Sequence, residues 1–222
     1  MGNNFTLKSA LVAFLASGLL AAGFSAPAEA ATTYTTSLRA AVRALPVAAE
    51  NNAGYDRDRY FGQWIDQNRD CQNTRAEVLI AESKVAPRYT TTRKCTVASG
   101  RWITTFDNRA HTSATTVQID HMVPVHEAWG SGARAWTQAR RVAFYNDLGY
   151  AGSLNAQTSS LNSSKQASGP ERWMPPANRC LYIAQWTTVK ARWGLKVDTA
   201  ERAALIKYAD SCPQVQLTIT RV

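Results

Sequence analysis

Apolar residues recur along much of the chain at the spacing of amphipathic helices. Within 31–55, Leu38, Val42 and Leu45 have helical spacing and predict a first helix or a partly ordered lead-in. Thr74, followed by Glu77 three residues later, has the form of a capping box and predicts a helix over 74–84. Other helical patterns cover 132–147, a turn from about 160, a segment from about 175 to Trp193, and a last helix from Asp198.

Strand patterns alternate with these helical segments. Two runs rich in Thr and aromatic residues, 89–97 and 101–106, flank Gly100 and predict a hairpin. The segments 115–121 and 153–158 also have the composition of strands. Because helices and strands are mixed and no internal repeat is present, the pattern predicts one α+β domain.

The N-terminus has the pattern of an export signal. Residues 9–24 are apolar or small and carry no charge, and small-x-small sites follow, which predicts a signal peptide over 1–30 cleaved after Ala30. This apolar run is shorter than the roughly 20 residues of a membrane-spanning helix. We therefore expect a secreted, extracellular protein without membrane attachment, with a partly helical lead-in over 31–69 and the main domain over 70–222.

Four cysteines are present, an even number that suits an exported protein. Three pairings are possible, and we favour Cys71 with Cys95 and Cys180 with Cys212, because each bond then joins one local unit. A zinc site is disfavoured, since no Cys-x-x-Cys spacing exists. The cysteines therefore predict a domain stapled by two disulfides.

Net charge indicates the kind of partner. The chain has 25 Lys and Arg against 16 Asp and Glu, a net charge of +9, which is typical of proteins that meet a polyanion. Segment 170–196 has five Lys and Arg against one Glu and is the predicted surface for phosphates. The side chains expected to bind substrate are Arg140, Arg172, Lys190 and Arg192.

One pair of neighbouring residues carries the candidate chemistry. Asp120 and His121 end a predicted strand, and Asn162 and Lys165 begin a helix after the next strand. This order is the layout of a ββα-metal nuclease site. A neutral imidazole accepts a proton from water at neutral pH, so His121 is the predicted general base. One carboxylate and one amide oxygen suit a hard divalent cation, so Asp120 and Asn162 are the predicted metal ligands.

The surrounding residues extend this pattern well beyond three positions. They are Asp120-His121, Glu127-Ala128-Trp129, Ser131-Gly132-Ala133, Trp136, Arg141, Asn146-Asp147, Asn162, Lys165, Trp173, Pro175-Pro176, Cys180 and Lys190. Over about 70–210 the chain resembles the secreted HNH endonucleases related to the C-terminal domain of GmrSD restriction enzymes. The resemblance implies a ββα-metal core with a helical insertion and additional helices. It also implies products with 5′-phosphate and 3′-hydroxyl ends.

The resemblance also assigns further roles. Arg141 and Lys165 are expected to take part in catalysis, and Glu127 either contributes to the metal site, orients His121, or forms a salt bridge. The expected cofactor is one divalent ion, Mg²⁺ with Mn²⁺ or Ca²⁺ as alternatives. The expected activity is hydrolysis of DNA, with RNA left open, by a monomer with little sequence specificity. The alternative is a non-catalytic basic protein, extracellular or on the cell surface, that binds nucleic acid or an anionic wall polymer.

Overall fold

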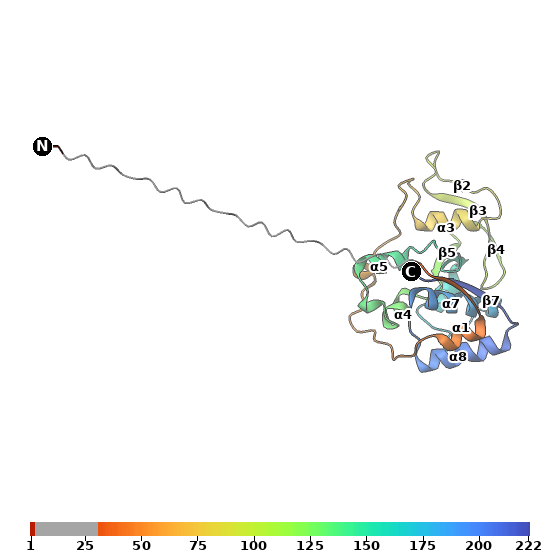
Figure 1. The fold of residues 1–222 in the computed structure, drawn as a ribbon. Coiled ribbons are helices and arrows are strands. Elements are labelled where there is room, and N and C mark those ends of the chain that lie inside the picture. Colours follow the sequence, from red (N-terminus) through yellow and green to blue (C-terminus); the bar gives the residue numbers. More distant parts are fainter. Residues whose placement is uncertain (3–30) are drawn as a thin grey trace. The chain divides into compact units, whose positions relative to one another are not determined.

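The first and last strands of the chain pair with each other. β1 (Thr33–Ser37) runs antiparallel to β7 (Gln216–Thr220) (Figure 1).

The computed structural model describes residues 1–2 and 31–222, so the predicted signal peptide, apart from its first two residues, lies outside the described residues. Within the described part of the chain, no helix has the length and apolar character needed to cross a membrane.

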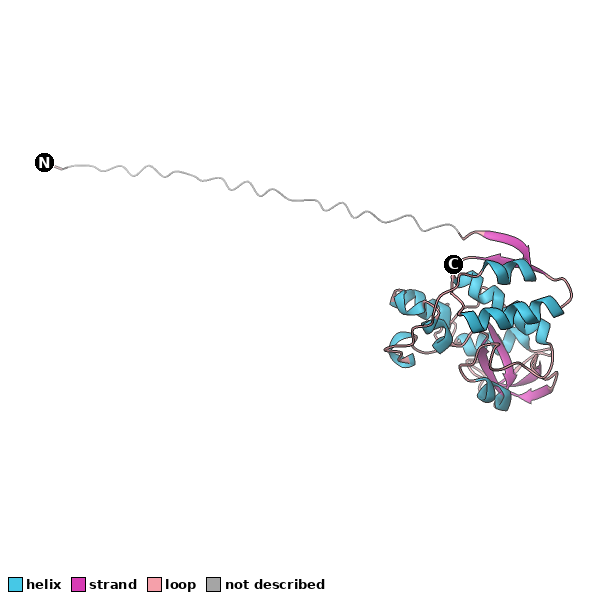
Figure 2. Cartoon of the chain, turned by 90° about the horizontal axis from the view of Figure 1, so that it is seen from below, coloured by secondary structure: helices cyan, strands magenta, loops and turns pink. Residues whose placement is uncertain are grey.

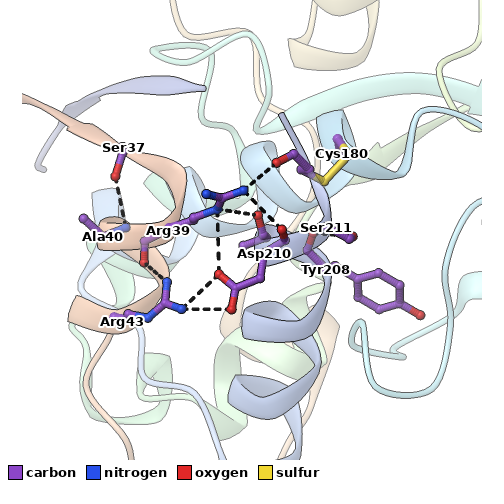
Figure 3. Close-up of polar contacts among 10 residues, drawn as sticks. Ser37, Arg39, Ala40, Arg43, Cys180, Tyr208, Asp210 and Ser211 are labelled. Carbon is purple, nitrogen blue, oxygen red and sulfur yellow. Dashed lines mark hydrogen bonds and ion pairs between the residues drawn. A yellow bond between two sulfur atoms is a disulfide. The ribbon is translucent and has the colours of Figure 1, made fainter. Parts of the chain in front are cut away.

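The helix that follows β1 packs against the last helix. α1 (Leu38–Ala44) lies beside α8 (Thr199–Ser211), and two arginines of α1 reach the same carboxylate (Figure 3). Arg43 Nη2 lies 2.9 Å from both carboxylate oxygens of Asp210, and Arg39 Nε lies 3.7 Å from Asp210 Oδ1. The early segment is thus bound to the C-terminal end of the fold.

A three-stranded antiparallel sheet corrects the predicted hairpin. Its strands, in spatial order, are β2 (Arg88–Tyr89), β3 (Val97–Ile103) and β4 (Ala110–Ser113). The prediction of a turn at Gly100 is wrong, because β3 runs through this residue. A Cβ at Gly100 would lie only 2.6 Å from Ser83 Oγ, so this glycine permits a close approach between segments.

A second antiparallel pair is formed as predicted and is followed directly by a helix. β5 (Val117–His121) pairs with β6 (Leu154–Thr158), with Asp120 opposite Asn155. α6 (Ser159–Lys165) begins at the residue after β6. This strand–strand–helix unit brings the end of β5 close to α6.

Short helices occupy the insertion between these two strands. The elements are α4 (Val125–Gly130), the 3₁₀ turn η1 (Ala133–Ala135) and α5 (Gln138–Tyr145). The prediction of one helix over 132–147 is therefore only partly right. The break follows from Thr137, whose side chain accepts a hydrogen bond from the backbone N–H of Arg140 and caps α5.

The remaining predicted helices are confirmed. α3 (Thr74–Glu82) is capped by Asn73, whose side chain accepts from Ala76 N–H, so the predicted capping box at Thr74 is wrong although the helix itself is confirmed. α8 is capped by Asp198, whose side chain accepts from Glu201 N–H, as predicted. α7 (Arg179–Trp193) ends at Gly194, which adopts the left-handed conformation with φ of 64°. α7 runs through the larger apolar core and buries side chains such as Trp186.

Two disulfides confirm the predicted pairing. Cys71 is bonded to Cys95, and Cys180 is bonded to Cys212. The second bond joins the start of α7 to the end of α8. The two predicted disulfides are therefore confirmed.

Figure 2 shows small groups of strands set among the helices, which confirms the predicted α+β class.

Candidate active site

One pocket of about 280 Å³ lies where β5, α4 and α6 meet. Asp120 and His121 at the end of β5 line it together with Asn162 of α6, so three residues predicted from the sequence share one site. His126 of α4 also lines the pocket, and Tyr55 and Arg57 come from the segment before α3. The other lining residues are Gln118, Ile119, Pro124, Val125, Ser163, Gln166 and Ala167.

The carboxylate of Asp120 is bound by a buried lysine. Lys165 Nζ donates to both carboxylate oxygens of Asp120, at 2.8 and 2.7 Å, and to the backbone carbonyl of His121 at 2.8 Å. Burial raises the pKa of the Asp120 carboxyl, and attraction to the Lys165 ammonium opposes this rise. Lys165 is fully buried and does not line the pocket. This location suits a residue that holds Asp120 and His121 in place rather than one that contacts substrate.

His121 is fixed between aromatic rings. Its ring stacks on Trp64, with centroids 5.0 Å apart and planes at 7°, and its Nε2 lies 2.9 Å from the carbonyl oxygen of Tyr145. A carbonyl only accepts, so Nε2 carries the proton, and in the neutral ring Nδ1 keeps the lone pair. Burial lowers the pKa of His121 to about 3, with a smaller lowering by the charge of Arg57. The imidazole is therefore neutral at physiological pH.

The amide of Asn162 is also oriented. Its Nδ2 donates to Gln118 Oε1 at 3.0 Å, which leaves Oδ1 of Asn162 as the acceptor of that amide. Both side chains line the pocket with Asp120. The pocket thus presents a carboxylate and an amide oxygen beside a neutral imidazole.

Comparison with known proteins identifies the family of the chain. The family described as "GmrSD restriction endonucleases, C-terminal domain" matches residues 73–208. The chain belongs to this family. This confirms the resemblance found in the sequence.

One relative gives a further indication. A protein of Arthroderma benhamiae named "Uncharacterized secreted protein" is 38% identical over 161 residues, which cover 72% of this chain and 76% of that protein. The prediction of a secreted, extracellular protein is confirmed by this comparison. No solved structure matches the chain.

The structure bears out the salt bridge that was one alternative for Glu127, and it places Lys190, expected to bind substrate, in the interior. Lys190 Nζ lies 2.6 Å from Glu127 Oε1 and 3.0 Å from Glu201 Oε2, and it donates to Ser131 Oγ. Glu127 does not line the pocket, and the ammonium of Lys190 supplies the positive charge that its carboxylate needs. Glu127 is therefore not placed to bind a metal beside Asp120, and Lys190 is not exposed to substrate.

Two more of the expected arginines are buried: Arg141, from the family pattern, and Arg192, from the basic segment 170–196. Arg192 forms two bonds with Asp147, at 2.9 and 3.0 Å. Arg141 donates to backbone carbonyls, including those of Tyr60 and Ala133. The expected roles of Arg192 in substrate binding and of Arg141 in catalysis are corrected accordingly, because internal acceptors already occupy both guanidinium groups.

The last two expected cations lie nearer the surface. The Arg140 guanidinium lies over the rings of Trp136 and Trp193, at 4.9 and 5.8 Å from their centroids, and donates to the carbonyl of Val222. Arg172 has a side chain that is 62% exposed and pairs with its neighbour Glu171. Neither residue lines the pocket, so a role for them in substrate binding remains a prediction for the surrounding surface.

Some residues of the site were not found from the sequence. Tyr55, Arg57, Trp64 and Tyr145 contact the pocket or the His121 ring, yet no motif marks them. The first three lie in a segment without clear periodicity and reach the site through tertiary packing. A concentration of aromatic residues over 55–64 is the one signal in the sequence.

The buried cluster around Lys190 predicts a pH effect. Burial raises the pKa of Glu201 from 4.5 to about 7; the nearby carboxylate of Glu127 adds to the rise and Lys190 opposes it. The folded state therefore holds a proton that the unfolded state releases, so this group's contribution to stability falls as pH rises from 4.5 to 7. We expect Glu201→Gln, which mimics the protonated form, to gain stability relative to wild type between pH 5 and pH 8.

Denaturant unfolding of both proteins at the two pH values measures this difference. Comparing the variant with wild type cancels the pH dependence of other groups. A difference in the free energy of unfolding that stays constant from pH 5 to pH 8 would show that Glu201 does not titrate in this range.

Proposed function

We propose that this protein is a secreted, metal-dependent endonuclease that hydrolyses phosphodiester bonds of DNA with little sequence specificity. The observation that carries the proposal is the shared pocket of Asp120, His121 and Asn162. Family membership over 73–208 supports the same reaction class. A non-catalytic binder of anionic polymers needs no such combination of groups, so the pocket favours the enzyme.

His121 is the proposed general base. Its Nδ1 accepts a proton from the attacking water, whose oxygen bonds to phosphorus while the 3′ oxygen leaves. The hydrogen bond from Nε2–H to the Tyr145 carbonyl holds the tautomer that this step requires. The stacked ring of Trp64 fixes the imidazole plane. Products with 5′-phosphate and 3′-hydroxyl ends follow from this bond breakage.

The oxygen donors of the pocket fit a hard divalent cation. Each carboxylate oxygen has two lone pairs, so Asp120 retains acceptor capacity beside its bonds to Lys165. Asn162 Oδ1 is the proposed second protein ligand. When bound, Mg²⁺, or Mn²⁺ or Ca²⁺ in its place, stabilises negative charge on the phosphate and leaving oxygen. Because only one carboxylate takes part, we expect modest affinity for the free ion.

Low sequence specificity follows from the context in which the enzyme acts. A secreted nuclease is separated from the chromosome of the cell that makes it, so recognition of particular sequences is not required for self-protection. The proposed ββα-metal unit of β5, β6 and α6 acts within a monomer. The proposed domain covers 70–222, and the lead-in over 31–69 contributes Tyr55 and Arg57 to the pocket.

Asn162→Ala tests the proposed ligand set. Loss of one oxygen ligand is expected to raise the Mg²⁺ concentration for half-maximal cleavage at least about tenfold. Ser160→Ala is the matched control, because Ser160 is an exposed residue of the same helix and does not line the pocket. Magnesium titration of cleavage measures both variants. The ligand assignment is wrong if Asn162→Ala and Ser160→Ala have the same magnesium dependence.

A further inference from the structure

A nuclease pocket needs a positive side chain that is free to meet a phosphate, and most of the expected cations are not free. Lys165 and Lys190 are fully buried against carboxylates, and Arg141 and Arg192 are buried against internal acceptors. Among the described residues that line the pocket, Arg57 is the one arginine or lysine. The site therefore has a single candidate for direct contact with phosphate.

Arg57 is exposed yet held in place. It is the first residue of α2 (Arg57–Tyr60), its Nη2 donates to the hydroxyl of Tyr145 at 2.8 Å, and its guanidinium lies 5.4 Å from that ring's centroid. Among the described residues, no carboxylate lies within 4.0 Å of its guanidinium nitrogens. The charge of Arg57 is therefore oriented without being neutralised.

Tyr145 links Arg57 to the general base. Its backbone carbonyl accepts the hydrogen bond of His121 Nε2, and its hydroxyl accepts the bond from Arg57. Tyr145 thus positions both His121 and Arg57 at the same pocket. Only one of the five N–H donors of the guanidinium is used by Tyr145, and the planar group suits the oxygens of a phosphate.

We propose that Arg57 forms a phosphate-binding site at the active site and contacts a non-bridging oxygen of the phosphodiester being cleaved. The inference rests on the proposed nuclease function and adds a substrate-binding residue to it. Arg57 lies before residues 73–208, so the segment outside the matched family region supplies this contact. The ligand class is a phosphodiester of a nucleic acid.

Replacement of Arg57 tests the site against a neighbour on the same helix. We expect Arg57→Ala to lower kcat/KM for a duplex oligonucleotide about 10- to 100-fold, because a charge-assisted hydrogen bond is lost, and Arg57→Lys to lose less. Arg59→Ala is the control: Arg59 lies over the Tyr60 ring, does not line the pocket, and should change kcat/KM less than about twofold. Thermal unfolding checks that each variant is folded.

Binding without cleavage gives a second measurement. With chelator present, the dependence of the duplex dissociation constant on salt should weaken in Arg57→Ala by about 0.9 in the logarithmic slope, one phosphate contact, and stay unchanged in Arg59→Ala. Equal activity and equal slopes in the two alanine variants would overturn the role of Arg57 even if wild type cleaves. Absence of cleavage by wild type overturns the proposed function instead, and the salt slopes then decide the Arg57 site alone.

Discussion

Replacement of His121 by alanine is expected to lower the cleavage rate about 10²–10⁴-fold while the protein stays folded. The reason is that His121 Nδ1 is the proposed acceptor of the proton from the attacking water. Its Nε2–H bond to Tyr145 and its stacking on Trp64 hold it in one orientation. Nucleic-acid binding should be almost unchanged, because the loss affects the chemical step rather than the contacts with phosphate.

His111→Ala is the matched control for this experiment. His111 lies on β4, contacts Thr116 and Thr158, and does not line the pocket. Its replacement should leave the cleavage rate within about twofold of wild type if both variants unfold at similar temperatures. A folded His121→Ala protein that keeps more than half of wild-type activity would exclude His121 as the base.

Lys190→Met is expected to destabilise the protein by about 3–5 kcal/mol, which is the cost of removing one partner of a buried ion pair. The ammonium of Lys190 is fully buried and contacts the carboxylates of Glu127 and Glu201. Without it, two buried carboxylates lose their counter-ion. The free energy of unfolding in denaturant measures this loss.

Lys196→Met provides the comparison for Lys190. The side chain of Lys196 is exposed three residues beyond Trp193, where α7, the helix that carries Lys190, ends, and its replacement should change stability by less than about 0.5 kcal/mol. A Lys190→Met protein as stable as Lys196→Met but with raised KM would instead support the original prediction that Lys190 binds substrate phosphates.

The local parts of the site were predictable from the sequence. Asp120 and His121 end one strand, and Asn162 lies on the helix after the next strand, so a single strand–strand–helix unit brings them together. The disulfides were predictable for the same reason, since each joins segments close in sequence. Short-range patterns determine features of this kind.

Features that depend on long-range packing were not predictable. The charge of segment 170–196 indicated a surface, yet Lys190 and Arg192 face carboxylates contributed by distant segments. Net charge counts residues and does not show which of them are buried. Arg57 reaches the pocket only because the early segment packs beside Tyr145, and no local pattern reports that contact.

Incubation of supercoiled plasmid with the purified secreted protein tests the central claim most directly. With Mg²⁺ present and low salt, the account predicts cleavage at many sites ending in short fragments, with less cleavage as NaCl rises. With chelator present, it predicts intact plasmid. Plasmid that stays intact with Mg²⁺, Mn²⁺ and Ca²⁺, or that is cleaved equally with chelator, would contradict a metal-dependent nuclease.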